Sequence, residues 1–397
     1  MLKGNAIIGQ SGGPTSVINS SLCGVIQACA RYPEAINKIY GMRFGIEGFM
    51  KEMLIDLGAE RADVVEGLKT TPSSALGSCR HKMQPEDFPV VLELLKKYDI
   101  RYYFLIGGND TMDTIHRIEA YCREQGYDLI GVGIPKTVDN DLFATDHTPG
   151  FGSAARYVAL SVLQAGILAR DMKHVDQFTI FQTVGRSAGW LPAAAACAKR
   201  SPEDAPHIIL LPERPFETEK FLAEAKAAYD QYGWVSIVCG EGVCFADGTP
   251  ISATNTNDRF GNKEFGAMGG TSAGMILHQL LSKTFGWRGE FQITESLQMS
   301  AADRAMPNDI EEAWACGARA VELAVQGTSG VMVTIQRDSN TPYAWSLGTS
   351  PLRDVALGEK PMPDEFICED RSFVTEACLE YLRPLVGELP KYVRFEG

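Results

Sequence analysis

One short segment places a lysine and two carboxylates directly after an apolar run. The segment is PKTVDND, residues 135–141, and it follows LIGVGI at residues 129–134. Such a run is typical of a buried parallel strand, and loops at the carboxyl ends of these strands carry the chemistry of α/β proteins. A carboxylate there can take a proton from a hydroxyl, and an ammonium group can stabilise phosphate oxygens. The alternative is a solvated turn with ordinary charges.

Two more turns of the same kind lie upstream. Residues 102–111 read YYFLIGGNDT and residues 6–19 read AIIGQSGGPTSVIN. Each pattern predicts an apolar strand followed by glycines and the start of a helix. Glycines allow the backbone to approach a ligand closely, and a helix start offers N–H groups to phosphate oxygens. Asn109 and Asp110 add oxygen atoms, which a hydrated Mg²⁺ prefers. Neither turn matches the Walker or dinucleotide pattern, yet together the three predict a polyphosphate site.

With these motifs in this order, the chain resembles a 6-phosphofructokinase of the pyrophosphate-dependent type. The loops of that family read SGG, GG[DN][GD][ST] and P[GK]T[IV]DND, and this chain has SGG, GGNDT and PKTVDND. The resemblance covers roughly residues 4 to 385. Further matching segments are GSCR at 77–80, TDHTPGFG at 145–152, GRSAGW at 185–190 and EG at 241–242.

The resemblance implies an α/β fold of two domains, each with a mainly parallel sheet flanked by helices, and an active site between them. We expect residues 1–148 with about 300–358 to bind the phosphoryl donor, and residues 149–299 with about 359–397 to bind the sugar phosphate. Relatives transfer phosphate reversibly from pyrophosphate to the C1 hydroxyl of fructose 6-phosphate, a step of glycolysis. They use Mg²⁺ and form homodimers or homotetramers.

The same resemblance assigns roles to residues of this chain. Asp139 matches the base that deprotonates the sugar hydroxyl, Asp141 a neighbouring carboxylate that helps hold the metal, and Asn109 the position associated with Mg²⁺. Lys136 is expected to stabilise charge on the donor. The remaining residues expected to bind the donor are Gly12, Gly13, Arg80, Gly108 and Asp110, and those expected to bind the sugar phosphate are Thr137, Gly185, Arg186 and Glu241.

Two positions favour pyrophosphate over ATP as the donor. Relatives that use ATP have glycines where this chain has Asp110 and Lys136. A carboxylate at 110 would repel the α-phosphate region of a nucleotide, and a lysine at 136 supplies a cation for a small, highly charged donor. A charged side chain at a close-approach position excludes a ligand rather than only weakening it.

The part expected to bind the sugar departs from the family pattern. Gln182 and Val184 stand where relatives have Glu and Met, and Met299 replaces an arginine that would grip phosphate. This leaves open a kinase of the same fold with another sugar-phosphate acceptor or with ATP as donor. A non-catalytic regulatory subunit is a further alternative, against which the intact charged residues Lys136, Asp139, Asp141 and Asp110 argue.

Composition restricts the class of protein. The net charge is −13 and no block of Lys or Arg occurs, which argues against nucleic acid or an anionic membrane as a partner. We expect no secretory signal before the first strand and find no uninterrupted apolar run of membrane-spanning length. The ten cysteines are scattered without a CxxC pair, which predicts reduced thiols in the cytoplasm rather than disulfides or zinc. His81 and His147 lie beside motifs and are interpreted as supporting residues.

Apolar periodicity predicts alternating strands and helices along the whole chain. A helix around residues 314–325 is expected to be capped by Asp309. A polar, glycine-rich segment at 252–271 is either a surface loop or a lid over the sugar. The other predicted helices span residues 86–99 and 151–170, and the predicted strands span residues 102–106, 178–184, 207–211, 235–239 and 330–336.

Overall fold

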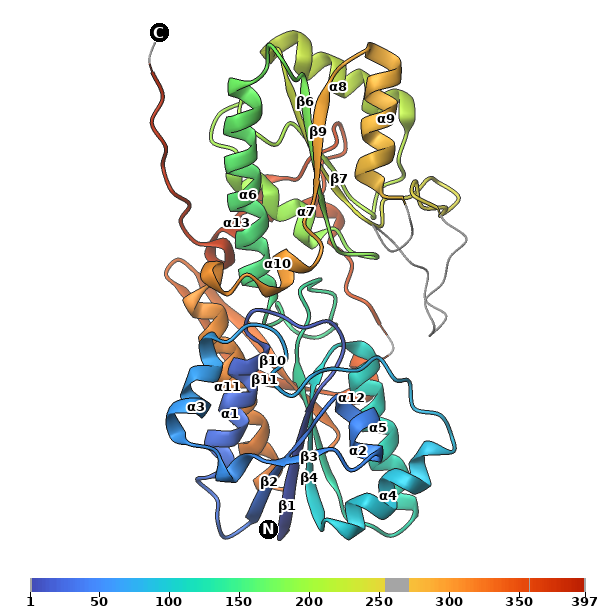
Figure 1. The fold of residues 1–397 in the computed structure, drawn as a ribbon, viewed down its shortest axis with the longest axis vertical. Helices are drawn as coiled ribbons and strands as arrows, with labels where there is room; N and C mark the ends of the chain where they lie inside the picture. The colour runs from blue at the N-terminus through green and yellow to red at the C-terminus, as the bar shows by residue number, and fades with distance from the viewer. Residues whose placement is uncertain (1, 254–270, 357, 396–397) are drawn as a thin grey trace. The chain divides into compact units, whose positions relative to one another are not determined.

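The computed structural model describes residues 2–253, 271–356 and 358–395, and the chain divides into two compact units (Figure 1). Unit 1 contains Met1–Gly152 and Met299–Lys360, and unit 2 contains Ser153–Gln298 and Pro361–Gly397. The chain therefore passes from one unit to the other three times, after Gly152, Gln298 and Lys360. The sequence predicts these passages near residues 148, 299 and 358. The predicted loop at 252–271 lies almost entirely outside the described residues.

Unit 1 is built on a seven-stranded sheet with the strand order β11-β10-β5-β4-β1-β2-β3. The five strands from β10 to β2 pair in parallel, while β3 and β11 pair antiparallel at the two edges. The strands are β1 Gly4–Gln10, β2 Ile36–Met42, β3 Leu54–Asp56, β4 Ile100–Gly107, β5 Ile130–Pro135, β10 Val331–Asn340 and β11 Tyr343–Pro351. The helices are α1 Ile18–Cys29, α2 Gly45–Met50, α3 Ala62–Gly67, α4 Asp87–Lys97, α5 Asn109–Glu124, α11 Pro307–Val325 and α12 Leu352–Ala356.

Helices cover both faces of this sheet because its central strands are apolar on both sides. In β4, Tyr102 and Phe104 belong to the core beneath α1 and α11, while Tyr103 and Leu105 belong to the core beneath α4 and α5. Successive side chains of a strand point to opposite faces, so a continuous apolar run feeds two cores. Figure 1 shows α1 and α11 on one side of the strands and α4 and α5 on the other.

The two helices on the first face touch through glycines. A Cβ atom on Gly24 of α1 would lie 2.1 Å from the carbonyl oxygen of Trp314, and one on Gly317 of α11 would lie 2.1 Å from that of Ser21. Only glycine allows backbones to come this close. These contacts pack α1 and α11 into one layer. The Ser20 hydroxyl also donates a hydrogen bond to the carbonyl of Ile310, which lies 290 residues later in the sequence.

Unit 2 has a four-stranded, fully parallel sheet with the order β7-β8-β6-β9. Phe178, Ile180, Val235 and Ile237 of this sheet form one core with α8 and α9, and α7 packs against β6, β7 and β8. The strands are β6 Phe178–Thr183, β7 Ile208–Leu210, β8 Val235–Gly240 and β9 Gly289–Ile293. The helices are α6 Phe151–Asp171, α7 Trp190–Ala194, α8 Thr218–Tyr232, α9 Ala273–Phe285, α10 Ser296–Ser300 and α13 Glu376–Val386; α6 and α10 span the passages between the units.

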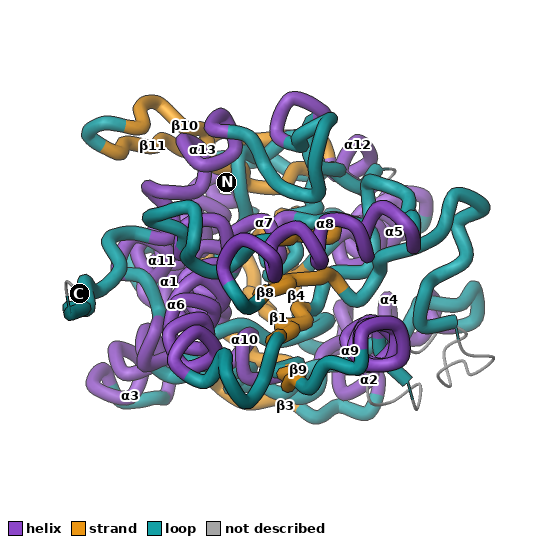
Figure 2. The backbone as a smooth tube through the Cα atoms, turned by 90° about the horizontal axis from the view of Figure 1, so that it is seen from above, coloured by secondary structure: helices purple, strands orange, loops and turns teal. Residues whose placement is uncertain are grey.

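The predicted elements are present, with two differences. The strand expected at 330–336 continues to Asn340 because it forms a hairpin with β11, which Figure 2 shows as two orange segments joined by a short teal turn. Asp309 is not the cap of α11: the helix begins at Pro307, and Asp309 in its first turn accepts a hydrogen bond from Gly150 N at 2.8 Å. A carboxylate in the first turn serves the helix dipole, and here it also holds a loop.

One described helix, α6, is long and apolar enough to cross a membrane by length and composition alone. The helix is not an uninterrupted apolar run, because Arg156 and Gln164 lie within it. However, 61% of its most apolar window is buried inside the protein, which is the behaviour of a core helix. The thiol prediction also has a structural counterpart: all ten cysteines lie within the described residues, and each of them is free.

Candidate functional site

The three motif loops of unit 1 lie at one edge of its sheet. Strands β1, β4 and β5 are adjacent and parallel, so their carboxyl ends meet at the same edge. The loops after these strands carry Gly12 and Gly13, Gly108 to Asp110, and Lys136 to Asp141. This is the position at which open parallel sheets bind ligands.

Lys136 connects two of the loops directly. Its ammonium nitrogen Nζ donates a hydrogen bond to the Gly13 carbonyl at 2.5 Å, and its backbone N–H donates to the Gly107 carbonyl at 3.0 Å. The residue is only 4% exposed. Burial lowers the pKa of Lys136 to about 8, although Asp139 and Asp141 raise it. The sequence predicted a cation presented to the donor; the structure shows a buried cation that first of all fixes the loops to one another.

The first loop owes its shape to Gly12. Its φ of +76° lies in the left-handed region, and a Cβ atom there would be 3.3 Å from the Lys136 ammonium nitrogen. Its N–H donates to the Cys79 carbonyl at 3.1 Å, and its carbonyl accepts a hydrogen bond from the Ser78 hydroxyl at 2.6 Å. The amide of Gly12 is therefore used inside the protein. The same contacts tie down the segment that ends in the exposed Arg80.

The second loop begins α5. Gly108 is the residue before the helix, and its carbonyl accepts the N–H groups of Thr111 and Met112. Asp110 lies in the first turn with its side chain 81% exposed, and its carboxylate is 3.5 Å from the ammonium nitrogen of Lys82. A carboxylate at this end of a helix is favoured by the helix dipole, so the charge at position 110 costs the fold little.

The third loop presents two carboxylates in different surroundings. The Asp139 N–H donates to the Thr137 hydroxyl oxygen at 3.1 Å, which sets the direction of the backbone between the two residues. Burial raises the pKa of Asp141, while a hydrogen bond from the Thr137 side chain and the nearby Lys136 act in the opposite direction. Thr137, which was expected to bind the sugar phosphate, thus lies in unit 1 and organises the two aspartates.

The residues of this edge fit a hydrated Mg²⁺. Oδ1 of Asn109 is buried and has no hydrogen-bond partner among the described residues, and the Asp139 and Asp141 carboxylates follow the neighbouring strand. No cluster of three or more His, Cys, Asp or Glu side chains that could hold a metal occurs in the described part of the chain. Mg²⁺ is commonly held by one or two carboxylates together with waters and substrate phosphates, so such a cluster is not required.

The remaining predicted residues lie together in unit 2. Gly185 follows β6 with a φ of +112°, and Glu241 follows the adjacent parallel strand β8. Nε of Arg186 is 3.9 Å from Oε1 of Glu241. Burial raises the pKa of Glu241, against the effects of Arg186 and of a hydrogen bond from the Gly185 backbone. A Cβ atom on Gly242 would lie 1.7 Å from the Arg186 carbonyl oxygen. The absence of a side chain at Gly242 therefore allows the backbone at Arg186 to pack against the residues that follow β8.

Two of the unusual residues have structural roles. The amide oxygen of the buried Gln182 accepts the N–H of Gly274 at 2.8 Å, next to the start of α9. The sulfur of Met299 lies 3.8 Å from the place where a Cβ atom on Gly13 would be. Met299 therefore lies beside the first loop of unit 1 and gives it an apolar neighbour.

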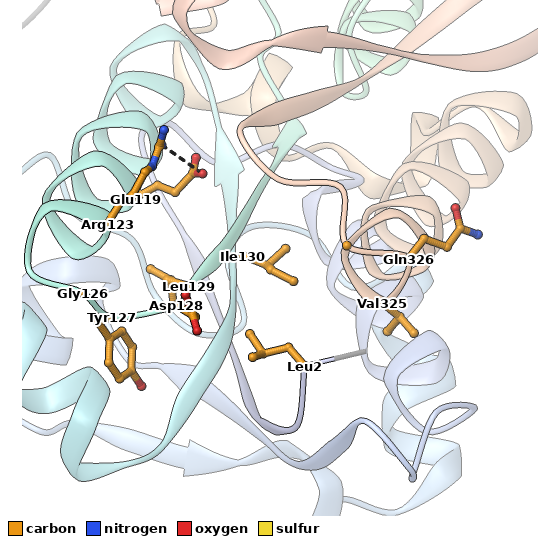
Figure 3. Close-up of a pocket in the computed structure, with 11 residues that line it drawn as sticks. Leu2, Glu119, Arg123, Gly126, Tyr127, Asp128, Leu129, Ile130, Val325 and Gln326 are labelled. Atoms are coloured by element: carbon orange, nitrogen blue, oxygen red, sulfur yellow. Dashed lines mark hydrogen bonds and ion pairs between the residues drawn. The ribbon is translucent and has the colours of Figure 1, made fainter.

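A pocket of about 460 Å³ in unit 1 carries none of the predicted residues (Figure 3). Leu129 and Ile130, at the start of β5, line it together with Val325 and Gln326 at the end of α11. The motif loops follow the other end of β5. Figure 3 shows Glu119 and Arg123 of α5 paired with each other at its margin, 3.4 Å apart. We therefore place the candidate site at the loops and not in this pocket.

A buried charged network next to the third loop was missed by the sequence analysis, apart from His147 as a supporting residue. His147 is fully buried; its Nδ1 is 2.7 Å from Oδ2 of Asp146 and its Nε2 is 2.8 Å from Oε2 of Glu312. Arg337 donates to the same Asp146 oxygen at 2.9 Å, and the Tyr343 hydroxyl donates to Glu312 at 2.5 Å. No local motif shows that β10, β11 and α11 contribute to this network. Only the TDHTP segment pointed to it.

Comparison with known proteins gives one consistent result. Residues 5–324 match the phosphofructokinase family model. The chain is 39% identical to the pyrophosphate–fructose 6-phosphate 1-phosphotransferase of Halomonas elongata, over 97% of this chain and 92% of that protein. It is 32% identical to the sulfofructose kinase of Alkalicoccus urumqiensis, over 92% of each chain. The crystal structure of the pyrophosphate-dependent phosphofructokinase of Nitrosospira multiformis superposes with a TM-score of 0.88 at 37% identity, covering 99% of this chain and 94% of that one.

The buried charged network around His147 predicts that the stability of the protein depends on pH. Burial lowers the pKa of His147, but Glu312 and Asp146 outweigh it and raise the pKa to about 9. The pKa of His147 is therefore higher in the folded protein than its value of about 6.5 in the unfolded chain. Protonation of His147 then adds to the free energy of unfolding; this contribution is fully present below pH 6.5 and is lost as the pH rises through 9. We expect this contribution to be about 3 kcal/mol. Urea unfolding of the wild type and of His147→Gln between pH 6 and pH 9.5 measures it: the difference in unfolding free energy should shrink by that amount, and a difference independent of pH would contradict the assignment.

Proposed function

The chain belongs to the phosphofructokinase family, and from this premise we propose that it transfers a phosphoryl group reversibly from pyrophosphate to the C1 hydroxyl of fructose 6-phosphate. The products are fructose 1,6-bisphosphate and phosphate. The observation that carries the proposal is the third loop. In it a buried lysine precedes two aspartates, at the edge of the sheet where the other two motif loops also begin. A rate measurement with fructose 6-phosphate and either pyrophosphate or ATP, coupled to product formation, tests it.

The chemical step assigned to this chain is a proton transfer at Asp139. Its carboxylate accepts the proton of the C1 hydroxyl as that oxygen attacks the donor phosphorus. Phosphoryl transfer needs little covalent help from the protein, so positioning and charge stabilisation supply the rest.

Charge on the donor is balanced by groups of unit 1. Lys136 places its cation beneath the first loop, and Arg80 is close enough to lower the pKa of Lys136 further. Asn109 and Asp141 are the residues that would hold Mg²⁺, which when bound neutralises charge on the phosphate oxygens. In unit 2, Gly185, Arg186 and Glu241 would bind the sugar phosphate. Gly12, Gly13, Gly108 and Asp110 would shape the space for the donor.

The proposal has further parts. We assign Mg²⁺ as the cofactor, the cytoplasm as the location and a homodimer or homotetramer as the assembly, because these accompany the activity in the family. We assign the donor to unit 1 and the sugar phosphate to unit 2. The step would be the one that forms fructose 1,6-bisphosphate in glycolysis.

The role of Asp139 as the base predicts the effect of one substitution. Asp139→Asn keeps the size of the side chain but removes its ability to take a proton. We expect kcat to fall by roughly 10² to 10⁴-fold, while the circular dichroism spectrum and melting temperature stay close to those of the wild type. Turnover near the wild-type value would remove Asp139 from this role.

The choice of donor depends on positions 110 and 136. We expect the wild type to work with pyrophosphate and Mg²⁺ and to show little activity with ATP. Asp110→Gly should raise the relative use of ATP because it removes the charge that repels a nucleotide, and Lys136→Gly should chiefly reduce the use of pyrophosphate. Asp113→Gly is the matched control, because Asp113 lies on the same helix and pairs with Arg117 at 3.6 Å. A wild type that prefers ATP, or an equal change in the control, would contradict the argument.

Met299 favours a second candidate, a kinase of the same fold with another acceptor. Its thioether lies beside Gly13 and cannot form the bidentate contact to phosphate that an arginine makes. One charge-assisted hydrogen bond contributes about 1.5–3 kcal/mol, or roughly 10- to 150-fold in binding.

We therefore expect a higher KM for fructose 6-phosphate than in relatives with arginine, and a lower KM in Met299→Arg. Steady-state kinetics with a panel of sugar phosphates measures both. Saturation of the wild type at low micromolar fructose 6-phosphate would show that other groups hold the phosphate.

A further inference from the structure

Lys360 contacts the third loop although it lies 220 residues beyond it in the sequence. Its backbone N–H donates to the Asp141 carbonyl at 2.7 Å, and the preceding residue, Glu359, forms an isolated antiparallel bridge with Leu142. The segment that ends unit 1 therefore pairs with the backbone that follows the two aspartates.

The side chain of Lys360 holds the same stretch at three more points. Its ammonium nitrogen donates to Oδ1 of Asn140 at 3.3 Å and to the carbonyl oxygens of Thr145 at 3.1 Å and Asp146 at 2.7 Å. An ammonium group has three protons to donate, so this arrangement matches its capacity. These bonds join the two ends of the loop that runs from Asn140 to Asp146.

The loop needs such a restraint because of its backbone. Asn140, between the two aspartates, has a φ of +55°, and Ala144 has a φ of +65°. Asparagine tolerates this region better than other residues with a side chain, but alanine occupies it only when its surroundings hold it there. Without the contacts of Lys360, relaxation of Asn140 would turn the peptide groups on both sides of it and with them the carboxylates of Asp139 and Asp141.

We propose that Lys360 is a positioning residue, which holds the backbone from Asp139 to Asp146 in the conformation that directs the two carboxylates. The hydrogen bonds of its side chain go to Asn140 and to the carbonyl oxygens of Thr145 and Asp146, so we assign its effect to the loop. This inference rests on the proposed function for its kinetic consequence, because a displaced base lowers the rate of the chemical step more than it weakens substrate binding. Displacement of a catalytic group by about 1 Å can cost on the order of 10²-fold in rate.

Unit 2 offers a matched control in Lys199. Its ammonium nitrogen also donates to three oxygens, the carbonyls of Pro202 at 2.8 Å, Asp204 at 2.6 Å and Pro206 at 3.1 Å. Burial lowers the pKa of Lys360 and of Lys199 alike, to about 8. Lys199 ties a turn that carries none of the proposed site residues, so its substitution reproduces the loss of a partly buried ammonium group with three hydrogen bonds without disturbing the third loop.

The experiment compares Lys360→Met, Lys360→Gln and Lys199→Met with the wild type in steady-state kinetics and in thermal unfolding. We expect Lys360→Met to lower kcat by about 10- to 100-fold and to leave KM for pyrophosphate and for fructose 6-phosphate within about threefold. Lys360→Gln, which keeps an N–H donor, should recover part of kcat. Lys199→Met should lose a similar amount of thermal stability and keep kcat within about twofold. A kcat in Lys360→Met within twofold of the wild type, or an equal fall in Lys199→Met, would overturn the proposal.

Hydrogen exchange in peptides that cover residues 138–147 gives a second measurement that does not depend on activity. Exchange in these peptides should be faster in Lys360→Gln than in the wild type and unchanged in Lys199→Met. This comparison can be made even if Lys360→Met does not fold. Unchanged exchange in Lys360→Gln would refute the positioning role. A wild type that is inactive with pyrophosphate and fructose 6-phosphate would refute the proposed function instead, and the exchange experiment would still decide the role of Lys360.

Discussion

The hydrogen bond between the Lys136 ammonium group and the Gly13 carbonyl is the constraint on which the candidate site depends. It joins the loops after β1 and β5, which are separated by β4 in the sheet and by 123 residues in the sequence. A buried cation is costly unless oxygens surround it, so this contact fixes both the lysine and the loop whose carbonyl accepts its hydrogen bond. The same ammonium group lies 3.3 Å from the place where a Cβ atom on Gly12 would be, so it also fills the space beside that glycine.

Charge is arranged in layers behind the reacting edge. Nearest to it lie Lys136 and the two aspartates, and behind the third loop lie Lys360 and the network of Asp146, His147 and Glu312. Each buried charge in this second group is paired with an opposite charge or with carbonyl oxygens, as burial in a low-dielectric interior demands. Lys360 and the hydrogen bonds of Thr145 to Ile335 thus hold the segment that follows the third loop.

The sequence predicted the α/β fold, the main strands and the site loops because these depend on local information. An apolar run such as 129–134 reports a buried strand, and glycines beside Asp110 or Lys136 report a close approach of backbone to ligand. It could not predict the contacts of Lys360 or Glu312, because nothing near either residue in the sequence shows which loop it will meet. The same limit explains Asp309: its type and place before a helix suggested a cap, but its partner, Gly150, belongs to a distant segment.

The interleaved order of the two units has a consequence for the synthesis of the chain. The sheet of unit 1 needs β10 beside β5, and α1 needs the backbone of α11 against Gly24, yet both partners follow the whole first segment of unit 2. When the ribosome has made residues 1–152, the first sheet has an unpaired edge at β5 and an uncovered apolar helix. An open edge and an exposed apolar face are what aggregation and chaperones recognise. The nascent enzyme must therefore stay in that incomplete state until nearly its entire length has been translated.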